Sequence, residues 1–127
     1  MNPEGITIIS SPYPVKETID RLQAFLEQHG ATIYARIDQQ AEVNKTGQSL
    51  APLQFILFGN PKAGGPIMAE NPIAALDLPL KIIAWEDARK KVWIAYNDAA
   101  YIEERYSLSN KPGSPLDLSN LIAQVLK

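Results

Sequence analysis

The sequence predicts an α+β fold, in which helices pack on a largely antiparallel sheet of about five strands. Apolar residues recur at three-and-four spacing between Val15 and Leu26, which is typical of an amphipathic helix. Five other runs have β-strand character, and a short polar connection joins the last two, 80–86 and 92–97, as an antiparallel hairpin. No array of alternating strands and helices is available to build a parallel sheet, so a doubly wound fold is disfavoured.

The first half of the chain gives three strands and one helix. Pro14 suits the first turn of the helix, and Gly30 suits the position just after its end. Two prolines also stop the first strand, because proline cannot continue a central strand. The other predicted elements are a strand at 6–10, a strand at 31–38, a polar loop or short helix at 39–49, and a central strand at 52–58 with an apolar run buried on both faces.

The second half begins with a segment rich in glycine, proline and alanine. Residues 59–79 predict a loop containing one or two short helical turns, interrupted at Pro72. After the hairpin, two helices are expected at 99–106 and 117–126.

Composition limits the classes of function. A length of 127 residues is usual for one domain, so residues 1–127 are expected to form a single domain. The net charge is −2 and no basic stripe is present, which argues against nucleic-acid binding. No apolar run approaches the roughly 20 residues of a membrane helix, and the first residues lack a signal-peptide pattern. We therefore expect a cytoplasmic protein with neither a nucleic-acid nor a membrane partner.

Metal chemistry has few candidate ligands. The chain has no cysteine, which removes disulfides and thiolate metal sites. The only histidine, His29, stands in the last turn of the first helix, where a capping or solvated role is favoured. Carboxylate binding of a hard cation by Glu86, Asp87 or Asp98 is an alternative to simple turn residues, and the turn is favoured. No metal site is predicted, and no motif identifies a cofactor.

The segment 59–66 superficially resembles a phosphate-binding loop because it is glycine-rich and follows a strand. It lacks the Lys and Ser or Thr that such a loop needs directly after its last glycine, since Gly64 is followed by Gly65 and Pro66. A structural turn is the favoured interpretation. The alternative is a ligand-contacting loop with Asn60 and Lys62 as hydrogen-bond donors.

Aromatic and polar residues of the hairpin form a second candidate site. Trp85 and Trp93 lie on its two strands, where core or interface packing is favoured over an aromatic wall for a ligand. The neighbouring polar candidates are Tyr96 and Asn97, with Glu86 at the end of the other strand. Asn97 and Asp98 are equally suited to cap the helix that follows, and this is the preferred role.

Several stretches together resemble the family called domain of unknown function 302. They are Ser11-Pro12 with the helix 15–26, Ala35-Arg36-Ile37-Asp38, 58–64, 75–81, Trp85-Glu86-Asp87, Val92-Trp93 and Tyr96-Asn97-Asp98. The resemblance covers residues 5 to about 108 and implies a curved antiparallel sheet and association as a homodimer. It supplies no activity and no catalytic residue, but it associates the Gly-Asn-Pro and Asp-Leu-Pro segments with a common site.

Three functional hypotheses follow. The first is a homodimer that binds a small ligand in a pocket lined by Trp85, Trp93 and the loop 59–65. The second is a protein–protein interaction module without a small-molecule site. The third is an enzyme of unassigned reaction using Lys62, Glu86 or Asp38 as acid or base.

Overall fold

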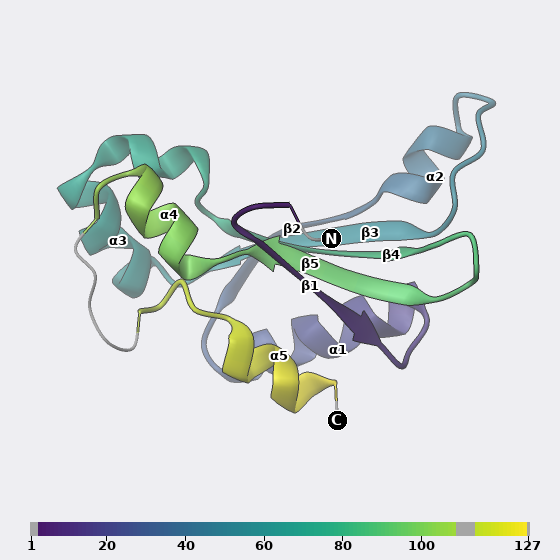
Figure 1. The fold of residues 1–127 in the computed structure, drawn as a ribbon, viewed down its shortest axis with the longest axis horizontal. Coiled ribbons are helices and arrows are strands. Elements are labelled where there is room, and N and C mark those ends of the chain that lie inside the picture. Colours follow the sequence, from purple (N-terminus) through teal and green to yellow (C-terminus); the bar gives the residue numbers. More distant parts are fainter. Residues whose placement is uncertain (1–2, 109–113, 127) are drawn as a thin grey trace.

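The computed structural model, which describes residues 3–108 and 114–126, is an α+β fold built on one five-stranded antiparallel sheet (Figure 1). The predicted fold class is confirmed, as is the hairpin. The elements in chain order are β1 (Ile6–Ser11), α1 (Val15–Gln28), β2 (Thr32–Asp38), α2 (Gln39–Asn44), β3 (Leu53–Gly59), α3 (Pro61–Glu70), the 3₁₀ helix η1 (Pro72–Leu76), β4 (Leu80–Glu86), β5 (Val92–Asn97), α4 (Ala99–Arg105) and α5 (Ser119–Val125).

The strand order is β1-β5-β4-β3-β2, so the first two strands lie at opposite edges of the sheet. The connection between them is α1, which must therefore cross the whole sheet. A helix of 14 residues is about 21 Å long, and five strands span about 19 Å between the outer two. The length of α1 thus matches the width that it crosses.

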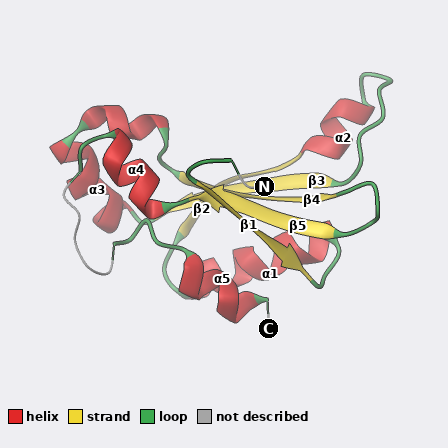
Figure 2. Cartoon of the chain, in the orientation of Figure 1, coloured by secondary structure: helices red, strands yellow, loops and turns green. Residues whose placement is uncertain are grey.

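Helices α1 and α5 cover one face of the sheet, as Figure 2 shows. The apolar positions that predicted α1 lie on its inner side, where Ile19 and Leu22 are fully buried. They pack with Ile122 of α5 against the inward residues Ile56, Ile82 and Ile94 of the three central strands. Burial of these apolar side chains is the main source of stability in a chain of this length.

In the part of the chain that the structure describes, the opposite face of the sheet carries no helix across its centre (Figure 1). Cross-strand register places a row of apolar side chains there, and most are half-buried. The prediction that β3 is buried on both faces is therefore wrong in part: Ile56 and Phe58 are buried on the helix-covered face, whereas Phe55 and Leu57 are half-buried on the open face. We call this surface the open face; its apolar members are Ile6, Ile8, Leu53, Phe55, Leu57, Ile83, Trp85, Trp93 and Ala95.

The glycine-rich segment departs furthest from its prediction, because it forms a helix of 10 residues rather than a loop. Asn60 is the N-cap, and its side-chain oxygen accepts a hydrogen bond from the Lys62 amide at 3.0 Å. Pro61 occupies the first helical position, where its missing N–H costs nothing. These start signals outweigh the low helix propensity of the glycines inside α3. The break at Pro72 was predicted correctly, since η1 begins there.

A second, smaller apolar cluster lies beyond one end of the sheet. It contains Ala74 of η1, Ile102 and Tyr106 of α4, and Leu116. Leu80, at the start of β4, packs against both this cluster and the main core. The segment that links η1 to the sheet is therefore held between two hydrophobic groups.

Candidate functional site

The two ends of the sheet differ in what surrounds them. At one end, which we call the α3 end, β3 runs into α3 and β4 begins after η1, so both helices stand beside the strand ends (Figure 1). At the other, the hairpin end, β4 and β5 are joined by a tight turn. The predicted site residues are divided between these two ends.

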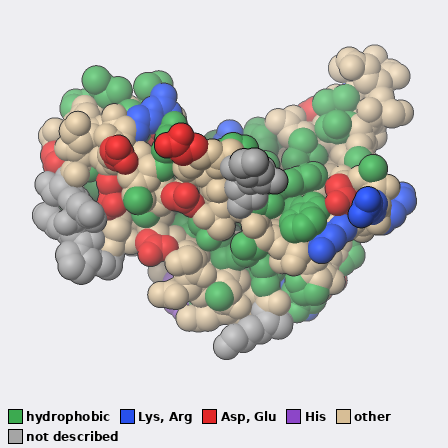
Figure 3. All heavy atoms as spheres, in the orientation of Figure 1, with side chains coloured by type: hydrophobic (Ala, Val, Ile, Leu, Met, Phe, Trp, Pro, Cys, Tyr) green, Lys and Arg blue, Asp and Glu red, His purple; other side chains and the backbone are tan. Residues whose placement is uncertain are grey.

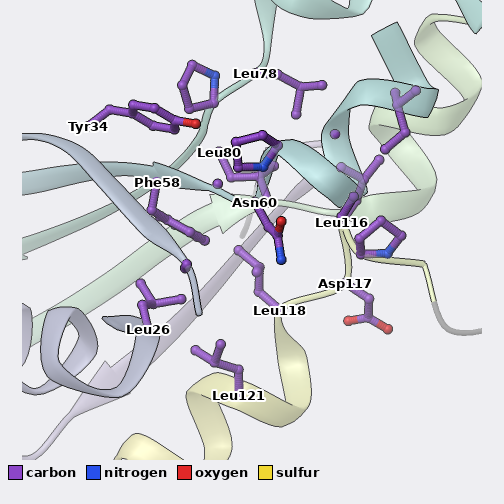
Figure 4. Close-up of a pocket in the computed structure, with 18 of the residues that line it drawn as sticks. Leu26, Tyr34, Phe58, Asn60, Leu78, Leu80, Leu116, Asp117, Leu118 and Leu121 are labelled. Carbon is purple, nitrogen blue, oxygen red and sulfur yellow. The ribbon is translucent and has the colours of Figure 1, made fainter. Parts of the chain in front are cut away.

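A cavity of about 330 Å³ lies at the α3 end. Its walls come from α1, β2, β3, α3, the segment that leads into β4, and α5 with the segment before it, and Figure 4 shows Phe58, Leu80 and Leu118 facing the space between them. Helix α3 forms one wall, yet none of its residues is fully buried. Mostly apolar walls around a volume of this size are typical of small-molecule sites.

Asn60 supplies a hydrogen-bond donor to this cavity. Its oxygen is used by the Lys62 amide, which leaves the side-chain nitrogen without a hydrogen-bond partner among the described residues. Figure 4 shows the carboxamide projecting between the apolar walls. Capping of α3 therefore fixes the amide so that its N–H groups remain available to a ligand.

Two more polar groups stand at the rim of the cavity. His29 Nδ1 lies 2.8 Å from the Phe25 carbonyl oxygen, and because a carbonyl can only accept, Nδ1 carries the proton. The ring nitrogen Nε2 is then an acceptor in the neutral form. Asp117 Oδ1 accepts hydrogen bonds from the Ser119 amide and hydroxyl at 3.0 and 2.7 Å. The hydroxyl bond is the main cause that lowers the pKa of Asp117 and keeps it ionised.

Two further cavities adjoin the first. One, of about 300 Å³, shares the wall formed by Leu78, Pro79 and Leu80 and reaches Asn97. The other, of about 210 Å³, shares Ala63 and Ile67 and lies against α4. The Gly-Asn-Pro and Asp-Leu-Pro segments thus meet at the first cavity, with Gly59–Pro61 and Leu78–Pro79 among its walls.

Asp77 ties the outer helices of this end together. Its Oδ2 accepts a hydrogen bond from Arg105 at 3.0 Å and another from the hydroxyl of Tyr106. The bond to the carboxylate is the main reason that the pKa of Tyr106 is raised. Asn71 Nδ2 also donates to the Tyr106 carbonyl at 2.8 Å. Polar bonds therefore hold η1 to α4, whereas α3 has few such restraints.

The tryptophans lie at the hairpin end. Trp85 and Trp93 are direct cross-strand partners on the open face, and neither lines the three cavities. Asp87 organises the turn beside them, since it accepts hydrogen bonds from the amides of Arg89 and Lys91 and, at 2.8 Å, from Trp93 Nε1. The bond from Trp93 is the largest of the causes that lower the pKa of Asp87.

The hypothesis of one pocket lined by both tryptophans and segment 59–65 therefore needs correction. Asn60 lies in the first cavity and Asn97 in the second, but Trp85 and Trp93 are at the opposite end of the sheet. The physical reason is the antiparallel register, which places Phe58 opposite Leu80 and Leu53 opposite Trp85. The start of β4 thus meets α3, and its end meets the hairpin turn.

The remaining predicted residues occupy separate places. Lys62 is exposed on α3 and lines none of the three cavities. Tyr96 lies on the helix-covered face at 8% exposure, and burial raises the pKa of its phenol. Asp98 stands at the N-cap position of α4, but its carboxylate accepts a hydrogen bond from Thr7 rather than from the helix. The predicted side-chain cap is thus replaced by a bond to β1.

The structure does not bring the residues of the acid–base hypothesis, or those of the cation hypothesis, together in one site. Asp38 caps α2 through a hydrogen bond from the Ala41 amide, and Glu86 pairs with Lys90 at 3.8 Å. Neither lines the cavities, and Lys62 lies at the other end of the sheet. Asp98 is likewise separated from Glu86 by the length of β5. Within residues 3–108 and 114–126, no three His, Asp or Glu side chains are grouped so that they could hold a metal ion.

Most of the cavity walls were not identified from the sequence. The missed residues come from α1, β2 and α5, and include Leu26, Tyr34, Leu118 and Leu121. One available signal was that Tyr34 puts an aromatic ring among the outward positions of its strand; it lies at a register irregularity of β2 and is 51% exposed. The helical residues carried no signal of their own, because their spacing indicates core packing equally well.

Membrane and structural comparisons complete the description. Among the described residues, no helix combines the length and apolar character needed to cross a bilayer. The fold is that of an uncharacterized conserved protein DUF302 from Bacillus stearothermophilus, whose crystal structure matches with a TM-score of 0.76 and 16% identity over 98% of this chain and 97% of that one. The class of protein is thus an α+β domain with a helix-backed antiparallel sheet.

The model of the family described as Domain of unknown function DUF302 matches residues 7–126. The chain belongs to this family. It is also 38% identical over 104 residues to proteins named Fluoride-specific ion channel FluC 1 from Brucella suis and from Brucella abortus. The match takes in 82% of this chain but only 41% and 38% of those proteins, so the chain spans about two fifths of their length.

Proposed function

We propose that this chain is a small-ligand-binding domain and that its ligand occupies the first cavity, beside Asn60. The single observation that carries the proposal is a space of about 330 Å³ between α3 and the sheet, with largely apolar walls and an unused amide donor. Binding sites combine these two features because apolar contact supplies affinity and a few fixed polar groups supply orientation. Residues 1–127 act as one domain in this proposal, and the cytoplasmic location stays a prediction.

A thermal-shift screen against a metabolite library tests the proposal. A compound that binds only the native state at about 100 times its Kd stabilises it by about 2.7 kcal/mol, which raises Tm by several degrees. The matched variants are Ala63→Phe, which puts a bulky ring into the cavity wall, and Ala88→Phe, which puts the same ring in the exposed hairpin turn.

The expected result is a compound whose shift is lost in Ala63→Phe and retained in Ala88→Phe. The proposal is contradicted if no compound in the library changes the Tm of the unmodified protein. So does a compound whose shift survives in Ala63→Phe, because its site then lies elsewhere.

We also propose that two copies associate through the open face to form a homodimer. The face carries an apolar ladder in which Trp85 pairs with Trp93 and Phe55 pairs with Ile83. Lysines of the same face stand against these aromatic rings: the Lys81 and Lys91 ammonium groups lie 4.5 Å from the ring centroids of Phe55 and Trp93. A twofold pairing would bury the same surface on both copies. The specific observation that favours the homodimer is that no helix of the described residues covers this face. Figure 3 shows apolar atoms gathered between the two raised ends of the molecule.

Light scattering coupled to size exclusion measures the association. The unmodified chain is expected to have the mass of a dimer, and Ile83→Lys, which places a charge in the middle of the open face, the mass of a monomer. Ala123→Lys adds the same charge to the exposed side of α5 and should remain dimeric. A monomeric unmodified chain would reject the homodimer and favour the alternative of a module that binds another protein.

Fluoride is not the ligand that this cavity fits. The curated relatives carry that ion in their name, but the name belongs to proteins about twice as long as this chain. A small, strongly hydrated anion loses much solvation energy in an apolar space. Among the described residues that line the first cavity, Asp117 is the only acid, and the only other ionisable side chains are His29 and the phenol of Tyr34. We therefore expect sodium fluoride to move Tm no more than sodium chloride at equal concentration.

A further inference from the structure

The charges around the cavities at the α3 end are predominantly acidic. Asp117 lines the first cavity, Asp77 the second, and Glu70 and Glu103 the third. Among the described residues, His29 lines the first cavity, and the one lysine or arginine in these walls is Lys81 in the second. Its ammonium group stands over the Phe55 ring on the open face, away from the first cavity.

Asp117 is the acid best placed to meet a ligand. Both Ser119 bonds go to Oδ1, which leaves Oδ2 without a hydrogen-bond partner among the described residues. Asp77, by contrast, already pairs with Arg105 at 3.0 Å. In Figure 4 the Asp117 carboxylate lies on the same side of the cavity as Leu118, and Asp117 is one of the residues that line the cavity. An anchored carboxylate with one unused oxygen is suited to a cationic donor.

His29 contributes to the same preference. With its Nδ1 proton committed to the Phe25 carbonyl, its second nitrogen accepts hydrogen bonds when the ring is neutral. Asp117 and His29 thus offer two acceptors at the rim, and no lysine or arginine of the described residues lines this cavity. A ligand with an anionic head would meet the Asp117 carboxylate without a lysine or arginine to balance it.

We propose that the first cavity takes a ligand with an apolar body and a single cationic amine, held by Asp117. This rests on the proposed function and names the chemical class of its ligand. Apolar walls bury the body, and the ammonium group stays at the rim, where it remains partly hydrated and pairs with the carboxylate. The same arrangement disfavours fatty acids and other apolar anions, because burial next to Asp117 would bring two negative charges together.

Three probes of equal chain length separate charge from apolar burial: octylammonium chloride, octan-1-ol and sodium octanoate. Isothermal titration with the full chain at pH 7 and low salt should rank octylammonium above octan-1-ol by about 1.5-fold to fivefold, which is the range of one partly exposed ion pair. Octanoate should bind weakest. Adding salt should reduce the advantage of the amine and leave octan-1-ol unaffected or slightly tighter.

Two variants move the preference in opposite directions. Asp117→Asn removes the charge and should bring octylammonium down to the affinity of octan-1-ol. Asn60→Asp keeps an oxygen to cap α3 but adds a carboxylate to the cavity, so octylammonium should bind tighter than it does to the unmodified chain. Asp87→Asn removes the same charge at the hairpin end and should change no ranking. Circular dichroism confirms that each variant is folded.

The outcomes separate this inference from the proposal on which it rests. If octanoate binds as tightly as octylammonium and Ala63→Phe blocks both, the amine preference is wrong and the cavity remains a ligand site. If octylammonium keeps its advantage in Asp117→Asn, the assignment of Asp117 is wrong. If none of the three probes binds, the cavity does not take apolar ligands and both proposals fail.

Discussion

The two ends of the sheet use the same strands but complete their packing differently. At the hairpin end, one carboxylate, Asp87, satisfies two turn amides and the Trp93 indole. At the α3 end, three cavities lie side by side, and α3, which lines the first and the third, has no fully buried residue. The hairpin end is closed by its own turn, whereas the α3 end brings together segments distant in sequence that leave space between them.

The difference teaches where this fold can accept a ligand without losing its stability. The main core lies between α1, α5 and the central strands, and its buried side chains pack against one another. The α3 end contributes less to holding the sheet together, since its own cluster centres on four buried residues. Regions with fewer buried apolar contacts open more easily, and binding sites are drawn from them.

The largest expected difference in unfolding free energy between the main core and the α3 end comes from truncating one isoleucine in each. Ile19 of α1 is fully buried, so Ile19→Ala should cost about 2–5 kcal/mol of unfolding free energy. Ile67 of α3 borders two cavities and is half-buried, so Ile67→Ala should cost about 1 kcal/mol or less. Urea unfolding followed by circular dichroism measures both. Equal losses would show that α3 is packed as tightly as α1.

A glycine substitution of intermediate effect tests whether α3 is a stable helix. Gly64 lies inside α3, and an added Cβ would meet only the Met68 methyl at 3.8 Å, an ordinary contact, so Gly64→Ala should raise the unfolding free energy by about 1 kcal/mol. Gly47 has nothing within 4 Å of an added Cβ but a φ of +87°, which disfavours alanine.

Thermal unfolding compares the two variants. Tm should rise by a few degrees for Gly64→Ala and fall for Gly47→Ala. A fall in Tm for Gly64→Ala would mean that segment 61–70 is not helical in solution, which would remove one wall of the proposed site.

The smallest expected effect concerns pH at the hairpin end. The pKa of Asp87 is lowered in the folded state, above all by the Trp93 indole, so its ionised form stabilises the fold. That contribution is complete above the ordinary carboxyl pKa of 3.8 and is lost as the pH falls through the lower, folded-state value.

Asp87→Asn keeps an acceptor oxygen but cannot titrate, so it should lose less stability than the unmodified chain between pH 5 and about pH 3. Both tryptophans lie at this end, and their fluorescence in urea titrations reports the transition. The same acid loss in both proteins would remove Asp87 as the cause.

Much of the fold followed from local periodicity. The helix 15–28 and the strands of the hairpin have patterns that only one secondary structure satisfies, and long-range packing did not change them. Segment 59–70 was misjudged because glycine and proline propensities outweighed the start signal of Asn60 and Pro61. The open face was missed because an apolar run does not show whether a second layer covers it.

The candidate site was predicted in part. Asn60 was identified as a donor, and the grouping of the Gly-Asn-Pro and Asp-Leu-Pro segments agrees with their meeting at one cavity. The two tryptophans were wrongly assigned to the same pocket, because the sequence does not show at which end of the sheet a strand residue lies. That depends on cross-strand register, which β3 and β4 set jointly.

Hydrogen exchange of backbone amides tests the central claim most directly, because it compares the two ends in one experiment. Without a ligand, amides of 61–70 should exchange at least tenfold faster than those of 92–97, and the best compound from the screen should slow 61–70 by at least as large a factor as it slows 92–97. Equal protection of both segments without a compound, followed by no change in 61–70 when one is bound, would contradict the assignment of the α3 end as the ligand site.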